Sequence, residues 1–427
     1  MLDVKLIREQ TDFVREDLKR RHHPEYLDYL EEFLKSDKKW RELVGETNKL
    51  RQRRNEISIE IAKAKKEKKD VSKLIKEAEK IPKKIKEIET ELIQLEERNK
   101  QLLMKIPNIM HASVPDGKDE NDNIEIRRWE TPPKFDFEPK DHLTILQNLG
   151  LIDVERAAKV AGHGFFFLKN ELVFLDLAIQ RFALETLRKK GFTIVEPPFM
   201  VNKQSYEGVA PLQDFQEMMY KIQGYDLFMI ATAEHPIGSM LRDETIDKKN
   251  LPLRFAGVST CFRKELGAHG KYTKGLFRMH QFNKIEQFIY CHPNDSYKML
   301  EEIQKNSEEL YQKLGLCYRV IEFCTGDLGI MKSKSYDIEV CMADGKFRES
   351  GSNSNLTDFS ARNLNIKFRE GPGKPPAGFV HTLNNTALAT SRVMIAIIEQ
   401  FQQKDGSVVI PKVLRPFMND IEILKKK

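Results

Sequence analysis

The stretch TCFRKELGAHG, residues 260 to 270, places an arginine and a glutamate two positions apart at the end of an apolar run. Alternate side chains of a β-strand share a face, so Arg263 and Glu265 are expected to project from the same side of a sheet. A guanidinium binds carboxylates and phosphates through paired hydrogen bonds, which makes this pair a candidate for phosphate chemistry. A cross-strand salt bridge on a solvated face is the alternative interpretation.

More charged side chains follow in the same part of the chain. The glycine-rich segment GAHGKYTKG is expected to return the chain to a partner strand, on which Arg278, Phe282 and Glu286 share a face. Arg392 is the only ionisable residue of the run ALATSRVMIAII, and an arginine among apolar neighbours requires a carboxylate or a phosphate partner. An ion pair in the core would also satisfy Arg392. Two arginines that reach one cleft beside acidic residues would suit a nucleoside triphosphate and its metal ion.

Several common catalytic and nucleotide-binding motifs are missing from the sequence. It contains no GxxxxGK[ST] loop, no GxGxxG after a strand, no GxSxG and no HExxH. The five cysteines have no CxxC pair and no zinc-finger spacing, so we expect reduced thiols and no zinc site. Any phosphate binding therefore depends on side chains that a sheet presents.

The elements that must position these residues lie in the second part of the chain. Strands are predicted for LFMIATA, LRFAGVSTCFR, QFNKIEQFIYC, YDIEVCMA and GFVHTLNN, and helices for VFLDLAIQRFALETLRKK and ALATSRVMIAIIEQFQ. Because several strands follow one another without helices between them, the prediction is an α+β fold with a largely antiparallel sheet flanked by helices.

The first quarter of the chain has a different pattern. Apolar residues recur at heptad spacing on both sides of KKEKKDVSK, which predicts an antiparallel helical hairpin over residues 27 to 105, about 45 Å long. Asp70 or Ser72 would cap its second helix, and Pro82 should kink that helix. A dimerisation or spacer coil is one interpretation of the hairpin. Its first helix is basic, however, so we expect it to contact RNA phosphates through Arg51, Arg53, Arg54, Lys63, Lys65 and Lys66.

Composition and segment boundaries complete the outline. The chain has 427 residues, of which 32% are charged, and its net charge of +6 is too small to indicate nucleic-acid binding by itself. Prolines and a PDG turn predict a linker over residues 106 to 138, between an N-terminal domain (1–105) and a catalytic domain (139–427). No signal peptide or membrane-spanning segment is evident, so a cytoplasmic protein without membrane contact is expected.

Several ordered segments resemble the signatures of the seryl-tRNA synthetases, which are class II aminoacyl-tRNA synthetases. They are ATAEHP, FRKELGAHGKYTKGLFRMHQFNKIEQF, FRESGSNSNLTDFSAR, HTLNNTALATSR and IPKVLRP. TAEHP and STCFRKE are more similar to the archaeal and eukaryotic branch. The resemblance covers nearly the whole chain, because the family also carries an N-terminal antiparallel coiled-coil arm for its tRNA. It implies a class II synthetase-like fold and a homodimer that uses ATP, Mg²⁺, L-serine and tRNA(Ser), and it leaves open whether tRNA(Sec) is also a substrate.

The resemblance also assigns roles to residues of this chain. Arg263, Arg392 and Glu349 would be catalytic, and Glu349 with Ser352 would hold the metal ion. The positions that match the family's serine pocket are Thr232, Ala233, Glu234, Arg263, Glu286, Asn384 and Thr386. The positions that match its ATP site are Arg263, Lys264, Glu265, Arg278, Phe282, Glu349, Ser350, Gly351, Ser352 and Arg392. Arg263 would hold the α-phosphate, Phe282 would stack on the adenine, and Arg392 would hold the γ-phosphate.

The implied reaction requires no protein nucleophile. The serine carboxylate would attack the α-phosphorus of ATP, and the seryl-adenylate would pass its acyl group to a ribose hydroxyl of tRNA. Catalysis would come from alignment of the reactants and from cations placed where negative charge accumulates. A pocket that hydrogen-bonds a hydroxyl rejects alanine, because buried polar groups are then left unpaired.

Some letters depart from the family pattern, namely Ser350, Gly351, Ser360, Asn363 and Tyr272. They motivate a second hypothesis, in which the chain is a catalytically impaired synthetase-like paralogue that binds RNA. A third hypothesis is a ligase that loads an amino acid onto a carrier protein, although such relatives lack the long arm.

Overall fold

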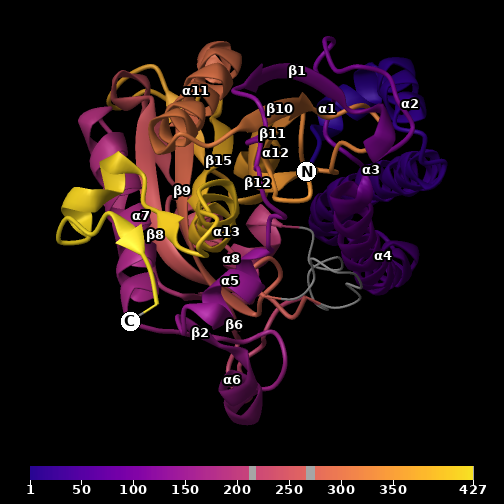
Figure 1. Cartoon of the computed structure of the whole chain (residues 1–427). Coiled ribbons are helices and arrows are strands. Elements are labelled where there is room, and N and C mark those ends of the chain that lie inside the picture. The colour runs from indigo at the N-terminus through magenta and orange to yellow at the C-terminus, as the bar shows by residue number, and fades with distance from the viewer. Residues whose placement is uncertain (211–217, 266–274, 427) are drawn as a thin grey trace. The chain divides into compact units, whose positions relative to one another are not determined.

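The computed structural model describes residues 1–210, 218–265 and 275–426. The chain divides into two compact units, Met1–Pro107 and Asn108–Lys427 (Figure 1). The predicted return segment GAHGKYTKG, which contains Tyr272, lies outside the described residues. The first unit consists of α1 (Val4–Glu9), α2 (Thr11–Arg20), α3 (Glu25–Lys66) and α4 (Ser72–Lys105).

Helices α3 and α4 form the predicted antiparallel hairpin. Their 42 and 34 residues span about 63 Å and about 51 Å, so both exceed the predicted length. The seam contains the expected apolar residues, with Ile57 and Ile81 buried in the part of the hairpin nearer its tip. The second helix begins at Ser72, and its N-cap position is occupied by Val71, so the prediction that Asp70 or Ser72 is the cap is wrong. The Asp70 carboxylate nevertheless accepts the backbone N–H of Ser72 at 2.9 Å, just before the helix. Pro82 lies inside α4, and the helix continues beyond it.

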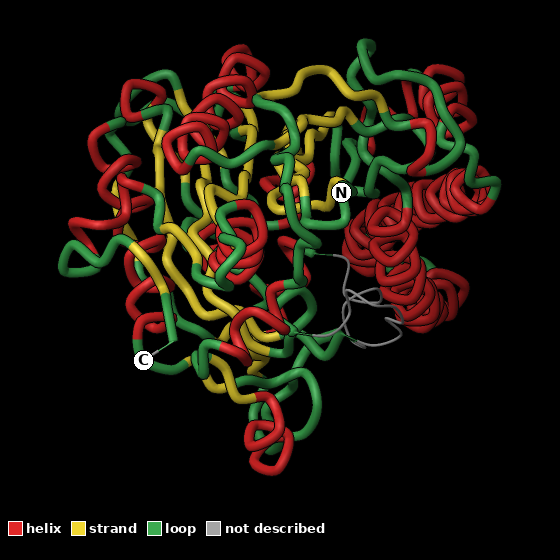
Figure 2. Tube along the Cα trace, in the orientation of Figure 1, coloured by secondary structure: helices red, strands yellow, loops and turns green. Residues whose placement is uncertain are grey.

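The second unit is built on an eight-stranded sheet in the order β1-β10-β11-β12-β15-β9-β8-β4. Figure 2 shows strands and helices of this unit in yellow and red. Its neighbouring strands are antiparallel except for β4 and β8, so the predicted antiparallel α+β fold is confirmed. The strands are β1 (Ile124–Trp129), β4 (Thr193–Val195), β8 (Leu253–Phe262), β9 (Gln281–Cys291), β10 (Tyr318–Glu322), β11 (Lys334–Cys341), β12 (Phe347–Thr357) and β15 (His381–Ala389).

Three helices cover one face of this sheet, and the main hydrophobic core lies between them and the strands. They are α7 (Glu171–Lys189), α11 (Ser296–Leu314) and α13 (Thr390–Gln400). Gln287 of β9 donates to the Ile303 carbonyl and to the Ser307 hydroxyl of α11, at 3.1 and 3.0 Å. Because strand side chains alternate, Lys284 and Glu286 point to the opposite face. That second face is where polar side chains can meet a ligand.

Shorter elements complete the second unit. They are α5 (His142–Asn148), α6 (Val154–Ala161), α8 (Lys203–Val209), α10 (Glu234–Ser239), α12 (Phe359–Asn363), β2 (Ile152–Asp153), β3 (Phe167–Leu168), β5 (Met200–Asn202), β6 (Leu227–Met229), β7 (Thr245–Asp247), β13 (Lys367–Arg369), β14 (Gly378–Phe379), β16 (Val408–Val409) and β17 (Ile423–Leu424). Within the described residues, we find no helix whose length and apolar character would allow it to cross a membrane.

Two predicted elements have different boundaries in the structure. LFMIATA contributes only the three residues of β6, which pair with β5 instead of joining the large sheet. The helix predicted from Ala387 begins at Thr390, because residues 387–389 still belong to β15. Both sides of that boundary are fully buried, so hydrophobicity alone could not locate it.

Residues 106–138 differ from the predicted linker. Asn108 is buried, and its amide donates to the carbonyls of Leu356 and Met331 at 2.8 and 3.0 Å. Residues 124–129 then form β1, an edge strand that pairs with β10. The side chains of β1 are mostly exposed. Its sequence, IEIRRW, alternates apolar and polar residues over only four positions, and the register of its pairing with β10 shifts between Glu125 and Arg127.

Candidate active site

Two adjoining cavities lie on the face of the sheet turned away from α7 and α11, and the start of α13 lines the smaller one with Ser391 and Arg392. The larger cavity has a volume of about 350 Å³ and the smaller about 50 Å³. Four residues line both of them: Arg263, Lys284, Glu349 and Thr386. These residues come from the end of β8 and from β9, β12 and β15, so four adjacent strands supply the partition between the cavities.

Arg263 lies at this partition, one residue beyond β8. Its backbone N–H donates to the His280 carbonyl at 3.0 Å, which extends the pairing of β8 and β9. Its guanidinium lies 3.4 Å from the Ala231 carbonyl oxygen and 5.3 Å from the centre of the Phe282 ring. Within the described residues no ion pair of Arg263 is found, so this guanidinium can bind an anion.

The predicted strand alternation of Arg263 and Glu265 is wrong. The strand has already ended, and Glu265 has a φ of 45°, in the left-handed region. Its carboxylate lies 3.6 Å from Arg278, which also precedes the start of β9. The salt bridge considered as an alternative therefore exists, but it joins Glu265 to Arg278 and leaves Arg263 to face the cavities.

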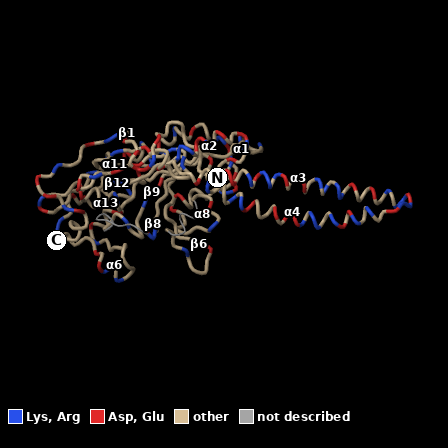
Figure 3. Tube along the Cα trace, turned by 90° about the vertical axis from the view of Figure 1, so that its right-hand side faces the viewer, with Lys and Arg blue, Asp and Glu red and all other residues tan. Residues whose placement is uncertain are grey.

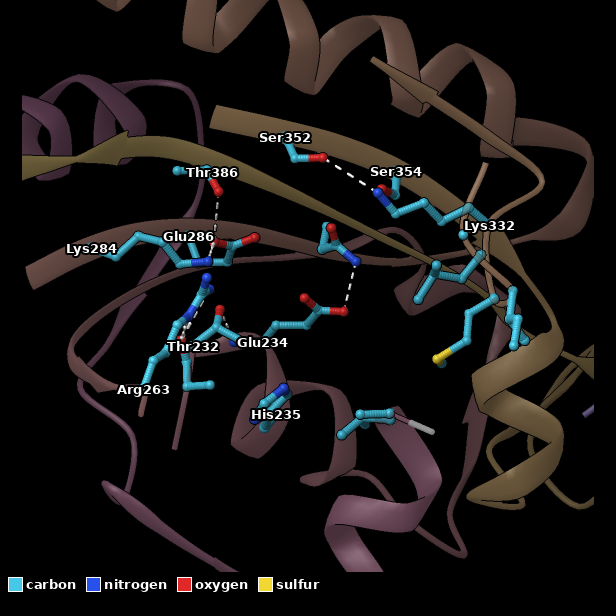
Figure 4. A pocket seen from close by; sticks show the side chains of 18 of the residues that line it. Thr232, Glu234, His235, Arg263, Lys284, Glu286, Lys332, Ser352, Ser354 and Thr386 are labelled. Carbon is cyan, nitrogen blue, oxygen red and sulfur yellow. Dashed lines mark hydrogen bonds and ion pairs between the residues drawn. The ribbon is translucent and has the colours of Figure 1, made fainter. Parts of the chain in front are cut away.

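The larger cavity contains the predicted serine-pocket residues, with one exception (Figure 4). Asn384 donates to Glu234 at 2.7 Å, and the Glu234 backbone N–H donates to the Thr232 hydroxyl at 3.2 Å. Thr386, directly opposite Glu286 in the paired strands, donates to that carboxylate at 3.4 Å. The exception is Ala233, which is fully buried and does not line the cavity.

Burial changes the acidity of several groups in this cavity. Burial, together with the charge of Glu286, raises the pKa of Glu234 to about 7. Burial also raises the pKa of Glu286, although Lys284 opposes the change through a 2.6 Å ion pair. His235 is buried beside them, and burial lowers its pKa to about 3, so it stays neutral. The cavity thus offers carboxylates that can accept hydrogen bonds from an ammonium group.

Arg392 lies at the wall of the smaller cavity. One guanidinium nitrogen is 3.1 Å from the Glu349 carboxylate and donates to the Glu349 carbonyl at 2.9 Å. The Arg392 guanidinium also lies 4.9 Å from the centre of the Phe277 ring. Arg392 is thus ion-paired, as its apolar neighbours require, but the Glu349 side chain is 49% exposed. The pair stands at the cavity wall and is not enclosed in the core.

The remaining predicted ATP-site residues divide into two groups. Glu265, Phe282, Ser350 and Gly351 line the smaller cavity, and Ser352 lines the larger one. Lys264 and Arg278 line neither cavity. The Lys264 ammonium instead lies 6.0 Å from the centre of the Tyr220 ring, and Arg278 is engaged with Glu265.

The structure gives a reason for Gly351, one of the residues that depart from the family pattern. A Cβ atom at Gly351 would lie 3.1 Å from the Thr386 carbonyl oxygen, so a larger side chain would push β15 away. Ser350 is buried and its hydroxyl accepts the Tyr311 hydroxyl at 2.8 Å. Ser360 is buried, and its hydroxyl has no hydrogen-bond partner among the described residues. Nothing in the structure explains Asn363.

Several lining residues were not predicted from the sequence. Lys284 alternates with its neighbours along β9 so that it shares a face with Phe282 and Glu286. This alternation was the signal that could have identified it. Lys332 and Ser354 also line the larger cavity, and the Lys332 ammonium lies 3.5 Å from the Ser352 hydroxyl (Figure 4). Lys332 lies between two strands, where periodicity gives no information.

Oxygen donors for a metal ion occur where the two cavities meet. Glu349 lines both cavities, and Ser352 stands directly opposite Asp337 in the paired strands β12 and β11. One carboxylate oxygen of Asp337 is buried without a hydrogen-bond partner among the described residues. Throughout residues 1–210, 218–265 and 275–426, no group of three or more His, Cys, Asp or Glu side chains has an arrangement that could hold a metal ion.

Basic and acidic residues alternate along α3 and α4 (Figure 3), and the six predicted contacts differ in their ion pairs. Arg51 pairs with Glu89 at 2.8 Å, and Arg53 pairs with Glu77 at 2.9 Å, so α4 supplies carboxylates to α3. The other four predicted contacts are exposed, and no ion pair involves them within the described part of the chain. They are Arg54, Lys63, Lys65 and Lys66.

Comparison with known proteins points to one family. Residues 219–401 match the model of the tRNA synthetase class II core domain (G, H, P, S and T), and residues 1–110 match the Seryl-tRNA synthetase N-terminal domain. The chain is 51% identical over 425 residues to a serine–tRNA ligase of Methanospirillum hungatei, with 99% of this chain and 100% of the relative covered. The structure is similar to a crystal structure of seryl-tRNA synthetase from Pyrococcus horikoshii complexed with ATP (TM-score 0.95, 46% identity, 100% of both chains). It is also similar to cytoplasmic serine–tRNA ligase from Naegleria fowleri in complex with AMP (TM-score 0.89, 33% identity, 100% and 99% covered).

Proposed function

This chain belongs to the seryl-tRNA synthetase family, and on that basis we propose that its two adjoining cavities hold L-serine and ATP side by side. The protein is a serine–tRNA ligase, which activates L-serine with ATP and transfers the seryl group to tRNA(Ser). The observation that carries the proposal is the charged partition, where Arg263 and Lys284 separate an acidic cavity from one lined by aromatic rings.

The larger cavity is complementary to the three polar groups of serine. Glu234 and Glu286 can accept hydrogen bonds from the ammonium group, and Arg263 can bind the carboxylate through its paired N–H donors. The hydroxyls of Thr232 and Thr386 can form hydrogen bonds with the serine hydroxyl. Alanine would leave such buried groups unpaired, which provides the selectivity for serine.

The smaller cavity suits a nucleotide. The Phe282 ring would provide a surface for an adenine, and the Arg392 guanidinium, which lines the same cavity, would provide positive charge for the terminal phosphates. Its volume of about 50 Å³ is much smaller than ATP, so most of the nucleotide would lie above the cavity. This arrangement places the α-phosphate close to Arg263, at the partition.

The chemistry follows from this placement. A serine carboxylate oxygen forms a bond to the α-phosphorus, the bond to the bridging oxygen breaks, and pyrophosphate leaves with that electron pair. Arg263 can contact both the attacking carboxylate and the α-phosphate, so it aligns the reactants and offsets the charge that develops between them. A ribose hydroxyl of tRNA then attacks the carbonyl carbon, loses its proton, and displaces AMP. No side chain has to form a covalent bond.

We also propose that Mg²⁺ accompanies ATP at Glu349 and Ser352. A magnesium ion is commonly held by one or two carboxylates together with substrate phosphates, so a cluster of three acidic residues is not required. The buried oxygen of Asp337 that has no hydrogen-bond partner in the described part of the chain, on the residue opposite Ser352, is the observation that fits a nearby cation. When bound, the ion would neutralise phosphate charge and favour the departure of pyrophosphate.

The binding of serine should depend on pH. Because the pKa of Glu234 is raised to about 7, this carboxyl is protonated below that pH and cannot pair with the ammonium group of serine. We therefore expect kcat/KM for serine to rise as pH increases from about 6 to about 8, measured by pyrophosphate exchange. The Glu234→Gln variant should lose this rise and have a lower value throughout. A wild-type profile that is flat or falls would contradict the assignment.

The experiment that tests the proposed function is pyrophosphate exchange into ATP with each of the twenty amino acids. Serine alone should support exchange, because the cavity matches its ammonium, carboxylate and hydroxyl groups together. Exchange with a different amino acid, or with none, would reject the proposed substrate. Omission of magnesium should abolish the exchange, and a chelator titration with added Mn²⁺ would check that requirement.

The two alternative functions are not favoured. Full-length relatives are serine–tRNA ligases, and Arg263, Glu349 and Arg392 all line the cleft, so the chain is not the impaired paralogue. A carrier-protein ligase would lack the arm that this chain contains. We propose in addition that the enzyme is a cytoplasmic homodimer and that the arm binds tRNA(Ser), while the charging of tRNA(Sec) stays an open prediction.

A further inference from the structure

A buried histidine connects three segments behind the smaller cavity. His142 is the first residue of α5, and its side chain is 3% exposed. Its Nδ1 lies 2.8 Å from the Glu399 carboxylate of α13, and the same oxygen accepts the His142 backbone N–H at 2.9 Å. On the other side of the ring, Nε2 accepts the backbone N–H of Leu276 at 3.2 Å. None of these residues was assigned a role by the sequence or by the cleft described above.

The contacts of His142 define its protonation state. The Leu276 amide can only donate, so Nε2 must present a lone pair. Nδ1 then carries the proton and donates it to Glu399, whose second oxygen accepts the Ala343 N–H at 2.8 Å. The ring is therefore neutral, with its proton on Nδ1. A doubly protonated ring would place two N–H groups against each other.

The backbone at Gly275, the residue before Leu276, lies so close to the His142 ring that no side chain would fit there. Gly275 has a φ of +75°, and a Cβ atom there would lie 2.4 Å from His142 Nε2. Glycine therefore allows the backbone to reach the ring closely enough for the Leu276 hydrogen bond. Leu276 is itself fully buried, so its N–H could not form a hydrogen bond with water in place of the one to His142. Loss of the imidazole acceptor would leave a buried donor unpaired.

The same connection completes a closed chain of contacts that includes two residues of the smaller cavity, Phe277 and Arg392. Phe277 follows Leu276 directly, and its side chain lies under the Arg392 guanidinium. Arg392 and Glu399 are seven residues apart on α13, which separates them by about 10 Å along the helix axis. His142 thus joins the far end of α13 to the segment that carries Phe277, and it sets the spacing between Phe277 and Arg392.

We propose that His142 is a positioning residue for the nucleotide half of the cleft, acting through its hydrogen bond to Leu276. This inference rests on the proposed function, because the smaller cavity is taken to be the ATP site. His142 does not line either cavity, and the residues of the serine side come from β9, β15 and the segment around Thr232. Loss of the hydrogen bond should therefore weaken the binding of ATP and leave the binding of serine unchanged.

Two variants of His142 separate positioning from general stability. His142→Asn keeps an N–H donor near the Nδ1 position for Glu399 but has no acceptor for Leu276. His142→Gln can place a carbonyl oxygen near the Nε2 position for Leu276 but loses the Nδ1 donor, while the backbone N–H of residue 142 still links α5 to Glu399. Each variant loses one buried hydrogen bond, so both should lower the melting temperature to a similar extent. In pyrophosphate exchange, His142→Asn should raise KM for ATP about tenfold, while His142→Gln should stay within about threefold of the wild type.

KM for serine should change by less than about twofold in both variants. Equal effects on the two Michaelis constants, or equal effects of the two variants on KM for ATP, would overturn the proposal.

If His142→Asn does not fold, ¹⁵N NMR of the histidine-labelled wild type provides the test: the His142 signals should show a neutral ring protonated on Nδ1. They should shift on addition of ATP but not of serine. An Nε2–H tautomer or a charged ring would overturn the proposal. ATP binding to the wild type by calorimetry stays measurable even if serine-dependent exchange is absent, so failure of the proposed function can be distinguished.

Discussion

Replacing Arg263 with alanine is expected to reduce serine-dependent pyrophosphate exchange by about 10³-fold. Arg263 lines both cavities and, within the described residues, has no ion-pair partner, so its charge is available to the reactants. Removal of the guanidinium eliminates both the alignment of carboxylate with α-phosphate and the positive charge at the reacting centre. The loss should appear mainly in kcat, because these interactions strengthen as the new bond forms.

Two further variants define the result for Arg263. Arg263→Lys keeps the charge but not the paired N–H donors, so it should recover only part of the activity. Arg156→Ala removes an exposed arginine of α6 that pairs with Asp153, and it should leave exchange unchanged. Normal exchange in the Arg263→Ala variant would show that the carboxylate and the phosphate do not meet at this partition.

Sequence reasoning was most accurate where a single periodicity governs an element. QFNKIEQFIYC corresponds to β9 residue for residue, and its alternation places Phe282 and Glu286 on the cleft side. The heptad seam of α3 and α4 is found as predicted, because the hairpin buries one apolar stripe. The prediction missed β1, a short, mostly exposed edge strand whose alternation is limited to four residues, and it misplaced the boundary at Thr390, where strand and helix are equally buried.

The site was predictable to the extent that its residues lie in regular strands. The family resemblance supplied the motifs, and the structure gathers Thr232, Glu234 and Asn384 in one cavity. The family resemblance could not predict the local backbone turn at Glu265. The φ of 45° at this residue directs its carboxylate toward Arg278. Nor could the resemblance supply partners that are distant in sequence. The carboxylates of α4 that pair with Arg51 and Arg53 are an example, because the basic character of the arm was inferred from its first helix alone.

Reversing the charge of the four exposed basic residues of α3 should greatly weaken the charging of tRNA(Ser). We expect the combined replacement of Arg54, Lys63, Lys65 and Lys66 by glutamate to lower kcat/KM for tRNA by about 10²–10³-fold. Phosphate contacts release counterions, so the slope of log KM for tRNA against log salt concentration should also decrease, by up to about 3–4. Aminoacylation measured over a range of potassium chloride concentrations provides both values.

The same variant carries its own control, because serine activation takes place in the other unit. Pyrophosphate exchange without tRNA should stay within about twofold of the wild type, and helical content by circular dichroism should not change. Replacing Arg51 and Arg53 by alanine should have a smaller effect, since Glu89 and Glu77 already neutralise these two charges. If charging survives the fourfold reversal, the arm is a spacer or dimerisation coil. Its exposed basic side chains would then serve solubility, and the tRNA would have to be recognised elsewhere.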